Sequence, residues 1–409
     1  MSNCLSYPFN GVVELPKGLD CGLMDENGNE ILVQKEGRKT VALVEIPAQG
    51  FKVFEKSGKA PEGEAASGAL VLENELIRYE FEKDGTIRRI FDKECGREVL
   101  ERNGRGNLFS LYKDRPAAHD AWDIDIYYEK CLLENAKSVK AEKIPGGFVR
   151  NGIRFTLKIG VSEIVQEAYL PFTGKRIDFK TVVDWKERHK MLRVSFPVDI
   201  RSETANYDIQ YSFMNRNTHR NTSWDFAKFE VVAHRYADIS EHGYGVAILN
   251  DCKYGHKIHE NVLDLNLLRS PTHPDADADL GVHEFTYSLL PHAGTLTEST
   301  VMAEAAMLNM GVNVFDGCGK PKFEVPCTID SDGISMEVLK KAEKEDCHVI
   351  RLVETKGHTS KGVLHVNLPK AKLIETNLLE WTEGKSISGA RPVEISMRPF
   401  EIRTYKIKI

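Results

Sequence analysis

Alternation of apolar and polar side chains is the strongest pattern in this sequence. Ile153, Phe155, Leu157 and Ile159 are separated by single polar or charged residues. The same spacing recurs in segments 177–183, 192–200, 285–289, 323–329 and 364–368. Because successive side chains of a β-strand point to opposite faces, these segments are predicted to be half-buried strands. Long amphipathic helical patterns do not separate them, so the sequence predicts an all-β chain of packed antiparallel sheets.

Two segments have the composition of helices. Segment 298–309 contains good helix formers and is predicted to be a short connector helix. Segment 335–346 also has helical propensity, but Ile334, Met336 and Val338 alternate with polar residues. Because packing in a sheet often overrides local propensity, a strand is favoured over a helix there.

The overall composition is that of an ordinary globular protein of 409 residues, with 41% hydrophobic residues, 28% charged residues and a formal net charge of −6. Lys and Arg do not cluster into a basic domain, which argues against nucleic-acid binding. No apolar run has the length of a membrane span, and the N-terminus lacks the pattern of a secretory signal. The eight cysteines are scattered without a CxxC pair, so free thiols and a cytoplasmic location are expected.

Breaks in composition predict three β units. Residues 57–68 are small, polar and rich in Gly and Pro, which is typical of an exposed linker. They separate an N-terminal β segment, 1–56, from a central domain, 69–308. A weaker break begins at residue 309, after which 309–409 is predicted to form a terminal β-sandwich of ordinary domain size.

Residues 215–255 are unusually dense in His, Trp, Asn, Asp and Arg. Polar and aromatic sequence that connects strands is where β-proteins usually place binding sites, although satisfied surface polar groups are the simpler interpretation. The residues predicted to line a site or a domain interface are His219, Asn221, Trp224 and Asp225. The residues predicted to form one buried polar network between the sheets are His234, Arg235 and Asp238.

A second candidate site is formed by Trp122, Asp123 and Asp125. On a strand the two carboxylates would share one face and Trp122 would point to the other. An aromatic face beside carboxylates suits stacking on sugar C–H groups and bonding to hydroxyls. The alternative is a buried Trp whose neighbouring Asp residues pair with an Arg such as Arg115. An independent glycosidase dyad is disfavoured, because both carboxylates lie on one segment without a partner acid.

Metal-binding patterns in the sequence are incomplete. Segment 275–286 begins like a calcium loop, but Leu280 and Thr286 occupy the positions that need Gly and Glu. Tyr287 likewise stands where an HExxH motif needs its second His. His256 and His259 are expected to be solvated. No metal or other cofactor is therefore expected in this chain.

Several blocks of sequence, in order along the chain, closely resemble the C-terminal region of glycoside hydrolase family 38 α-mannosidases of the cytosolic or vacuolar type. The most specific block contains NTSWDFAKFE and SEHGYGVAILNDCKYG; others are LENELIRYEF, WDIDIYYE and LLRSPTHPDADADLG. The resemblance implies a galactose-mutarotase-like supersandwich with smaller flanking β-sandwich domains. It also places a strand at 335–346. The LLRSP element resembles a family segment whose Arg reaches toward the substrate, so Arg269 is expected on the same rim as His219 and Trp224, with a free guanidinium. An ion pair with Asp264 or Asp275 is the alternative.

The resemblance also has consequences for activity. Family members hydrolyse terminal α-D-mannosides with a carboxylate nucleophile, an acid/base carboxyl and a zinc ion, carried by an N-terminal domain that no segment here matches. The chain is therefore expected to support a catalytic domain absent from it, with zinc held in that domain, and to be inactive alone. The alternatives are one half of a split α-mannosidase and a stand-alone carbohydrate-binding or mutarotase-like protein. An α-mannoside glycan and a second copy of the chain in a homo-oligomer are further candidate partners. Exposed apolar surface is expected near the N-terminal segment and the 215–225 loop.

Overall fold

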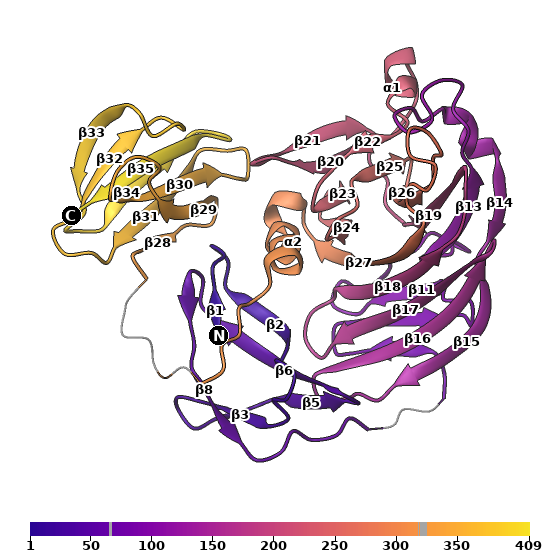
Figure 1. Ribbon diagram of the computed structural model, residues 1–409, viewed down its shortest axis with the longest axis horizontal. Coiled ribbons are helices and arrows are strands. Elements are labelled where there is room, and N and C mark those ends of the chain that lie inside the picture. The colour runs from indigo at the N-terminus through magenta and orange to yellow at the C-terminus, as the bar shows by residue number, and fades with distance from the viewer. Residues whose placement is uncertain (65–67, 318, 320–324) are drawn as a thin grey trace.

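The computed structural model describes residues 1–64, 68–317, 319 and 325–409. Strands dominate this part of the chain, and its α-helices are the short α1 (Ser223–Ala227) and α2 (Val301–Met310). The predicted all-β class is confirmed, as is the connector helix near 298–309. Figure 1 shows a large central unit at the right, a smaller N-terminal unit below α2, and a C-terminal sandwich at the left. Within the described residues, no helix is long and apolar enough to cross a membrane.

The central unit is built around a nine-stranded antiparallel sheet. In spatial order this sheet contains β15 (Lys137–Ile144), β16 (Arg150–Ile159), β17 (Ser162–Pro171), β18 (Ile177–Trp185), β27 (Gly281–Ala293), β24 (Tyr244–Asn250), β23 (Tyr236–Glu241), β20 (Thr204–Ile209) and β21 (Ser212–Asn217). Burial alternates along β18 because one face of the strand covers the core and the other does not. Phe179 and Val183 are fully buried, whereas Val182 on the opposite face is exposed.

Two further sheets cover the inner face of the nine-stranded sheet. A six-stranded sheet contains β14 (Leu132–Asn135), β13 (Leu108–Lys113), β19 (Lys190–Pro197), β26 (Val262–Arg269), β25 (Gly255–His259) and β22 (Val231–Val232). A four-stranded sheet contains β12 (Arg97–Glu98), β11 (Ile87–Asp92), β10 (Ile77–Phe81) and β9 (Val71–Glu73). Rings meet across the layers, with Phe196 of β19 6.1 Å from Phe179 and Phe81 of β10 5.5 Å from Phe155 between ring centroids. All three sheets therefore share one hydrophobic core.

Trp185, at the end of β18, provides a local probe of this core. It is 0% exposed, whereas the other three tryptophans, Trp122, Trp224 and Trp381, are between 63% and 78% exposed. A change of its fluorescence on unfolding therefore reports on the central unit.

The N-terminal unit contains three small sheets around its own core. Their strands are β2 (Phe9–Glu14), β6 (Lys39–Ile46) and β5 (Val33–Glu36); β4 (Glu30–Ile31), β3 (Gly22–Asp25) and β8 (Phe54–Ser57); and β1 (Ser2–Asn3) with β7 (Gly50–Phe51). A buried ion pair joins this unit to the central one, with Arg150 Nη2 2.6 Å from Glu36 Oε2. Gln34 adds hydrogen bonds to the backbone at 148–150.

The C-terminal unit is a two-sheet sandwich with a separate core. One sheet contains β28 (Cys327–Asp330), β31 (Ser360–Val366) and β34 (Val393–Met397), and the other contains β29 (Ile334–Lys341), β30 (His348–Glu354), β35 (Ile402–Lys408), β32 (Lys372–Thr376) and β33 (Glu383–Ser388). The strand favoured over a helix at 335–346 is confirmed as β29, and the helical alternative is wrong. Of the predicted strand at 323–329, Phe323 lies outside the described residues.

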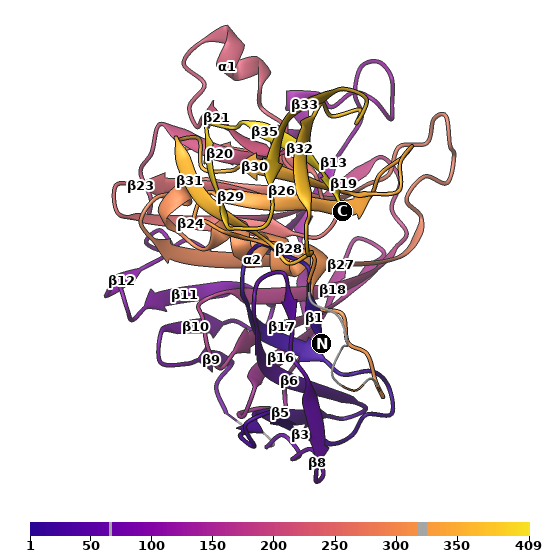
Figure 2. The same cartoon turned by 90° about the vertical axis from the view of Figure 1, so that its left-hand side faces the viewer.

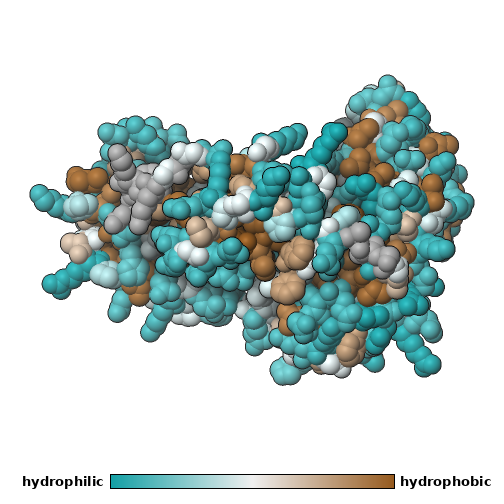
Figure 3. Space-filling model, turned by 90° about the horizontal axis from the view of Figure 1, so that it is seen from below, coloured by the Kyte–Doolittle hydropathy of each residue, from teal (hydrophilic) through white to brown (hydrophobic). Residues whose placement is uncertain are grey.

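A largely apolar hollow of about 1140 Å³ lies where the N-terminal unit, the end of α2 and the C-terminal sandwich meet. Its lining includes Leu5, Leu15, Phe54 and Met310. Figures 1 and 2 agree in placing these three parts around it. Seen from below, hydrophobic residues reach the surface in the middle of this face, between hydrophilic surroundings (Figure 3). Apolar surface thus lies beside the N-terminal segment, as the sequence predicts.

Candidate functional site

Three loops meet at one end of the central unit. The first, 114–131, follows β13 and includes the 3-10 helix η1 (Ile126–Lys130); the second, 218–230, follows β21 and includes α1; the third, 270–280, follows β26. Figure 1 shows them together at the upper right, around α1. All eight residues predicted to lie near a substrate belong to these loops or to the end of β26 that feeds them.

Arg269, the last residue of β26, fastens the first loop to the sheet. Its Nε donates to the carboxylate of Asp114, and its Nη atoms donate to the backbone carbonyls of Ala121, Asp120 and Asp123. The side chains of Arg269 and Asp114 are only 13% and 4% exposed. The prediction of a free guanidinium at Arg269 is therefore wrong, because the loop supplies an acceptor to each of its three nitrogens. Arg269 does form an ion pair, as the alternative prediction stated, but its partner is Asp114 and not Asp264 or Asp275.

Glu129 of η1 joins the first loop to the second. Arg220 donates to both of its carboxylate oxygens, at 2.8 and 2.7 Å, and Lys257 of β25 lies 3.2 Å from it. Burial opposes ionisation of Glu129, but the hydrogen bond from Arg220 and the charge of Lys257 outweigh burial and lower its pKa to about 2. The carboxylate is therefore ionised at neutral pH and holds α1's loop against η1.

A second layer of charge lies beneath these contacts, on the outer face of the six-stranded sheet. Arg193 of β19 is 1% exposed, with its Nε 2.6 Å from Asp264 and its Nη1 2.8 Å from Glu230. The Tyr128 hydroxyl donates to Glu230 at 2.5 Å, and the Arg193 guanidinium lies 5.3 Å from the centre of the Tyr128 ring. Burial raises the pKa of Glu230 against the opposing charge of Arg193. This group anchors η1 and the end of the second loop from below.

Trp122, Asp123 and Asp125 lie on irregular backbone and not on a strand, so the predicted separation of their side chains onto two faces is wrong. The local reason is that Asp120, Ala121 and Asp123 turn their carbonyls toward Arg269. Trp122 is 78% exposed and lies beside the His119 ring, which excludes the buried-Trp alternative. Asp125 accepts a hydrogen bond from the Ala117 N–H at 2.7 Å.

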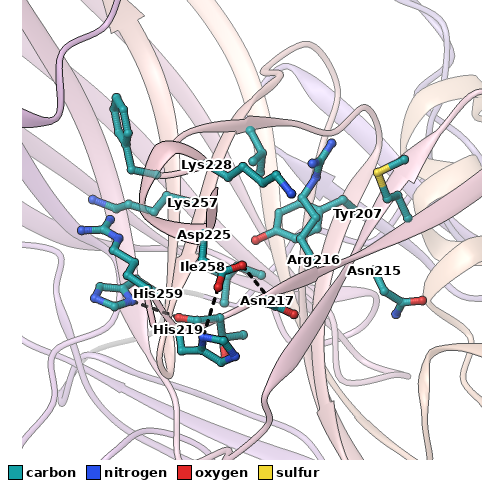
Figure 4. A pocket seen from close by; sticks show the side chains of 15 residues that line it. Tyr207, Asn215, Arg216, Asn217, His219, Asp225, Lys228, Lys257, Ile258 and His259 are labelled. Atoms are coloured by element: carbon teal, nitrogen blue, oxygen red, sulfur yellow. Dashed lines mark hydrogen bonds and ion pairs between the residues drawn. The ribbon is translucent and has the colours of Figure 1, made fainter. Parts of the chain in front are cut away.

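The second loop presents its aromatic residues to solvent. Trp224 is 77% exposed and Asn221 is exposed too. Asp225 faces inward, where it accepts hydrogen bonds from Asn217 and Thr222 and lies 3.8 Å from His219 Nδ1. Figure 4 shows Asp225 between Asn217 and His219. The structure therefore brings His219 and Asp225 together and leaves Asn221 and Trp224 on the outer surface.

The exposed aromatic side chains of the first two loops form what we call the aromatic rim. Its members are Trp122, Tyr127, Trp224 and Phe226, which are 78%, 72%, 77% and 48% exposed. Large exposed aromatic residues on loops that buried ion pairs hold in place are typical of a binding surface, for a partner or for sugar rings. This is the second region in which the sequence predicts exposed apolar surface.

The predicted network of His234, Arg235 and Asp238 is divided in two. Asp238 is fully buried and accepts hydrogen bonds from Asn206 and Ser240, with His292 Nε2 2.9 Å away. Arg235 pairs instead with Asp208, at 3.0 Å. Asp238 lies on β23 and Asp208 on β20, so both groups of contacts stabilise the nine-stranded sheet.

Sequence reasoning did not single out Arg193, Glu230 or Asp114, which hold the site in place. Arg193 did carry a signal, because it is a charged residue between the apolar Leu192 and Val194 in a predicted strand. Its importance depends on the cover provided by η1, which lies more than 60 positions earlier in the chain and which local pattern does not reveal.

One group of three possible metal ligands occurs among the described residues, formed by Asp92, Glu94 and Cys95. The ammonium of Lys175 lies 2.9 Å from Asp92, 2.6 Å from Glu94 and 3.7 Å from Cys95. A cation is thus already supplied by the chain, and these residues do not fit a metal ion. In the segment that begins like a calcium loop, one of the three carboxylates, Asp277, forms an ion pair with Arg188 at 2.5 Å.

His256 of β25 corrects another expectation, because it is fully buried and not solvated. Its Nε2 lies 3.4 Å from the Asn250 amide. Burial, with a smaller effect of the nearby Arg193 charge, lowers its pKa to about 3. The residue is therefore neutral in the folded protein.

We predict that His256 makes the central unit less stable in mild acid. In the unfolded chain a His has a pKa near ~6.5, so below that pH the unfolded state takes up a proton that the folded state excludes. Stability is therefore lost as the pH falls from about 6.5 toward 3, by about 2 kcal/mol between pH 7 and pH 5. Urea unfolding monitored by Trp185 fluorescence at both pH values measures this loss. In His256→Gln the loss should shrink by that amount, whereas the exposed His348→Gln should retain it; an unchanged loss in His256→Gln would refute the assignment.

Comparison with known proteins places this architecture in a family. Residues 72–277 match the glycosyl hydrolases family 38 C-terminal domain, and residues 333–405 match the family 38 C-terminal beta sandwich domain. The chain belongs to glycoside hydrolase family 38. Within that family it corresponds to the C-terminal portion of an α-mannosidase, as the sequence resemblance predicts.

The chain spans well under half the length of the α-mannosidases that it matches, between 33% and 40%. Alpha-mannosidase 2C1 of Homo sapiens is 35% identical over 390 residues, an alignment that spans 90% of this chain and 37% of the human protein. Alpha-mannosidase G of Dictyostelium discoideum is 33% identical, with 99% of this chain and 40% of that protein aligned. The family 38 fold is also seen in the crystal structure of an alpha-mannosidase from Enterococcus faecalis V583, with a TM-score of 0.74 and 18% identity over 99% of this chain and 55% of that one.

Proposed function

We propose that this chain supports and completes the active site of a family 38 catalytic domain that hydrolyses terminal α-D-mannosides. The observation that carries the proposal is the aromatic rim, four exposed aromatic residues on loops that are held by one buried and one partly buried ion pair. Large exposed aromatic side chains on neighbouring loops are a usual feature of interaction surfaces. The relatives that this chain matches are α-mannosidases in which the aligned region covers 33–40% of the length.

The aromatic rim faces the catalytic domain in this proposal, and the nucleophile, the acid/base carboxyl and zinc belong to that domain. The chain's own contribution is to hold the surface: Arg269 positions the 120–123 turn and Glu129 positions α1. A cytoplasmic location is part of the proposal, because the seven described cysteines are unpaired.

We predict that the purified chain does not hydrolyse an aryl α-mannoside, with or without added zinc, because the groups that cleave the glycosidic bond lie outside it. Zinc-dependent turnover should appear when the chain is combined with a separately produced family 38 catalytic domain. Release of the aryl alcohol measures the activity, and size-exclusion chromatography measures the association.

A variant with Trp122 and Trp224 both changed to Ala should associate more weakly, while the exposed Trp381→Ala, on the C-terminal unit, serves as the matched control. Turnover by the chain alone, or failure of the two polypeptides to associate, would overturn the proposal. Affinity of the chain alone for α-mannosides, lost in Trp122→Ala, would instead favour a stand-alone carbohydrate-binding protein.

A further inference from the structure

A small polar pocket lies behind α1, between the β20–β21 hairpin and β25. Its volume is about 150 Å³, and its lining includes Tyr207, Arg216, Asp225, Lys228 and Lys257. In Figure 4 Lys228, Tyr207 and Arg216 lie on one side of the pocket, with Lys257 on the other. The second loop lines one side of the pocket, and the four residues of the aromatic rim do not belong to its lining.

Some of the Arg and Lys side chains that line this pocket are paired with a carboxylate, and others are not. Arg220 and Lys257 are paired with Glu129, as described above. Arg216 and Lys228, in contrast, form no ion pair and donate no side-chain hydrogen bond to any residue that the structure describes. The Arg216 Nε is itself buried without a hydrogen-bond acceptor.

The carboxylate that lines the pocket does not neutralise these two cations. The oxygens of Asp225 are occupied by Asn217 Nδ2 at 2.8 Å and Thr222 Oγ1 at 2.7 Å, with His219 beyond them. Two unpaired cations therefore face one carboxylate that is already hydrogen-bonded.

A buried guanidinium N–H that lacks an acceptor lowers stability, and the cost is recovered when an acceptor binds. Arg216 is also held in place, since its guanidinium lies 5.9 Å from the centre of the Tyr207 ring. A positioned guanidinium beside an ammonium is the usual arrangement for binding oxyanions, because the guanidinium donates in a planar fork and the ammonium supplies a point charge.

We propose that this pocket binds a small oxyanion of the phosphate type, with Arg216 and Lys228 as its main ligands. The anion is either free inorganic phosphate or the phosphate group of a phosphorylated sugar. The proposal requires no catalytic domain and goes beyond the function proposed above.

Isothermal titration of the purified chain at low ionic strength tests this proposal, with inorganic phosphate as the first probe. Saturable binding is expected, and Arg216→Gln and Lys228→Gln should each weaken it about tenfold or more. Lys385→Gln is the matched control, because Lys385 is an exposed lysine on β33 of the C-terminal unit. Arg216→Lys should bind with intermediate affinity, and an unchanged Trp185 emission verifies that each variant is folded.

A hexose 6-phosphate and the free hexose distinguish the two sources of the anion. Tighter binding of the hexose phosphate than of phosphate supports a sugar phosphate, and equal binding supports the free anion. The proposal is overturned if phosphate does not bind saturably, if both Gln variants bind like the wild type, or if the free hexose binds as well as its phosphate.

Discussion

Arg269→Ala should destabilise the central unit by about 3–5 kcal/mol and release the 114–125 loop. The change leaves the Asp114 carboxylate, which is 4% exposed, without its cation, and it removes the donor to three backbone carbonyls. Removing one partner of a buried ion pair typically costs this much, because the remaining charge stays buried. Urea unfolding monitored by Trp185 measures the stability, and limited proteolysis within 114–125 measures the loop.

Two variants control for the loss of charge. Arg269→Lys keeps the charge but not the planar set of donors, so it should be intermediate. Arg188→Ala removes an exposed Arg, between β18 and β19, that pairs with Asp277 of the third loop, and should cost less than about 1 kcal/mol. With the catalytic polypeptide present, the folded fraction of Arg269→Ala should retain its specific activity if Arg269 acts only through the loop. Unchanged stability with a fall in kcat/KM would show instead that Arg269 acts on the substrate.

Arg193→Ala should be similarly damaging, by about 3–5 kcal/mol, through a different group of residues. The variant leaves Asp264 and Glu230 buried on the sheet without their shared cation. It also removes the guanidinium from the face of Tyr128, which loosens η1. The midpoint of urea unfolding should fall accordingly, and amide exchange should accelerate in 126–130.

The matched control for Arg193 is Arg89→Ala, which removes an Arg that is 44% exposed and paired with Glu98 at 2.6 Å. Pairs at this exposure contribute little, so its stability should change by less than about 1 kcal/mol. Equal effects of the two variants would show that the buried position of Arg193 is not what makes it important.

Strand alternation made the fold class predictable, because side-chain burial in a two-layer sandwich repeats every second residue. Segment 177–183 illustrates this, with Phe179 and Val183 buried in the core as the pattern requires. The same rule was wrong at 122–125. Asp123 and Asp125 were expected on one face of a strand, but their backbone is bent toward Arg269, whose position in space is set by the pairing of β26 with β19.

The sequence predicted which segments form the candidate site, but not which of their side chains contact one another. Local composition identified the 215–225 loop and the Trp122 segment. It did not reveal that Glu129 meets Arg220, which are 91 positions apart, or that Asp114 meets Arg269, 155 positions away. Such contacts depend on how the sheets bring distant segments together.

The order of strands in the nine-stranded sheet also affects how the chain folds during synthesis. β18 ends at Trp185, but its inner neighbour β27 begins only at Gly281. At a ribosomal rate of ~5–20 residues per second, the edge of β18 stays unpaired for roughly 5 to 20 s. During that interval the emerging chain exposes backbone donors and acceptors along an apolar strand, the kind of edge that pairs with other chains. Folding of the central unit is therefore expected to depend on protection of nascent β18, which makes the yield of folded protein sensitive to chaperone supply and to translation speed between residues 185 and 293.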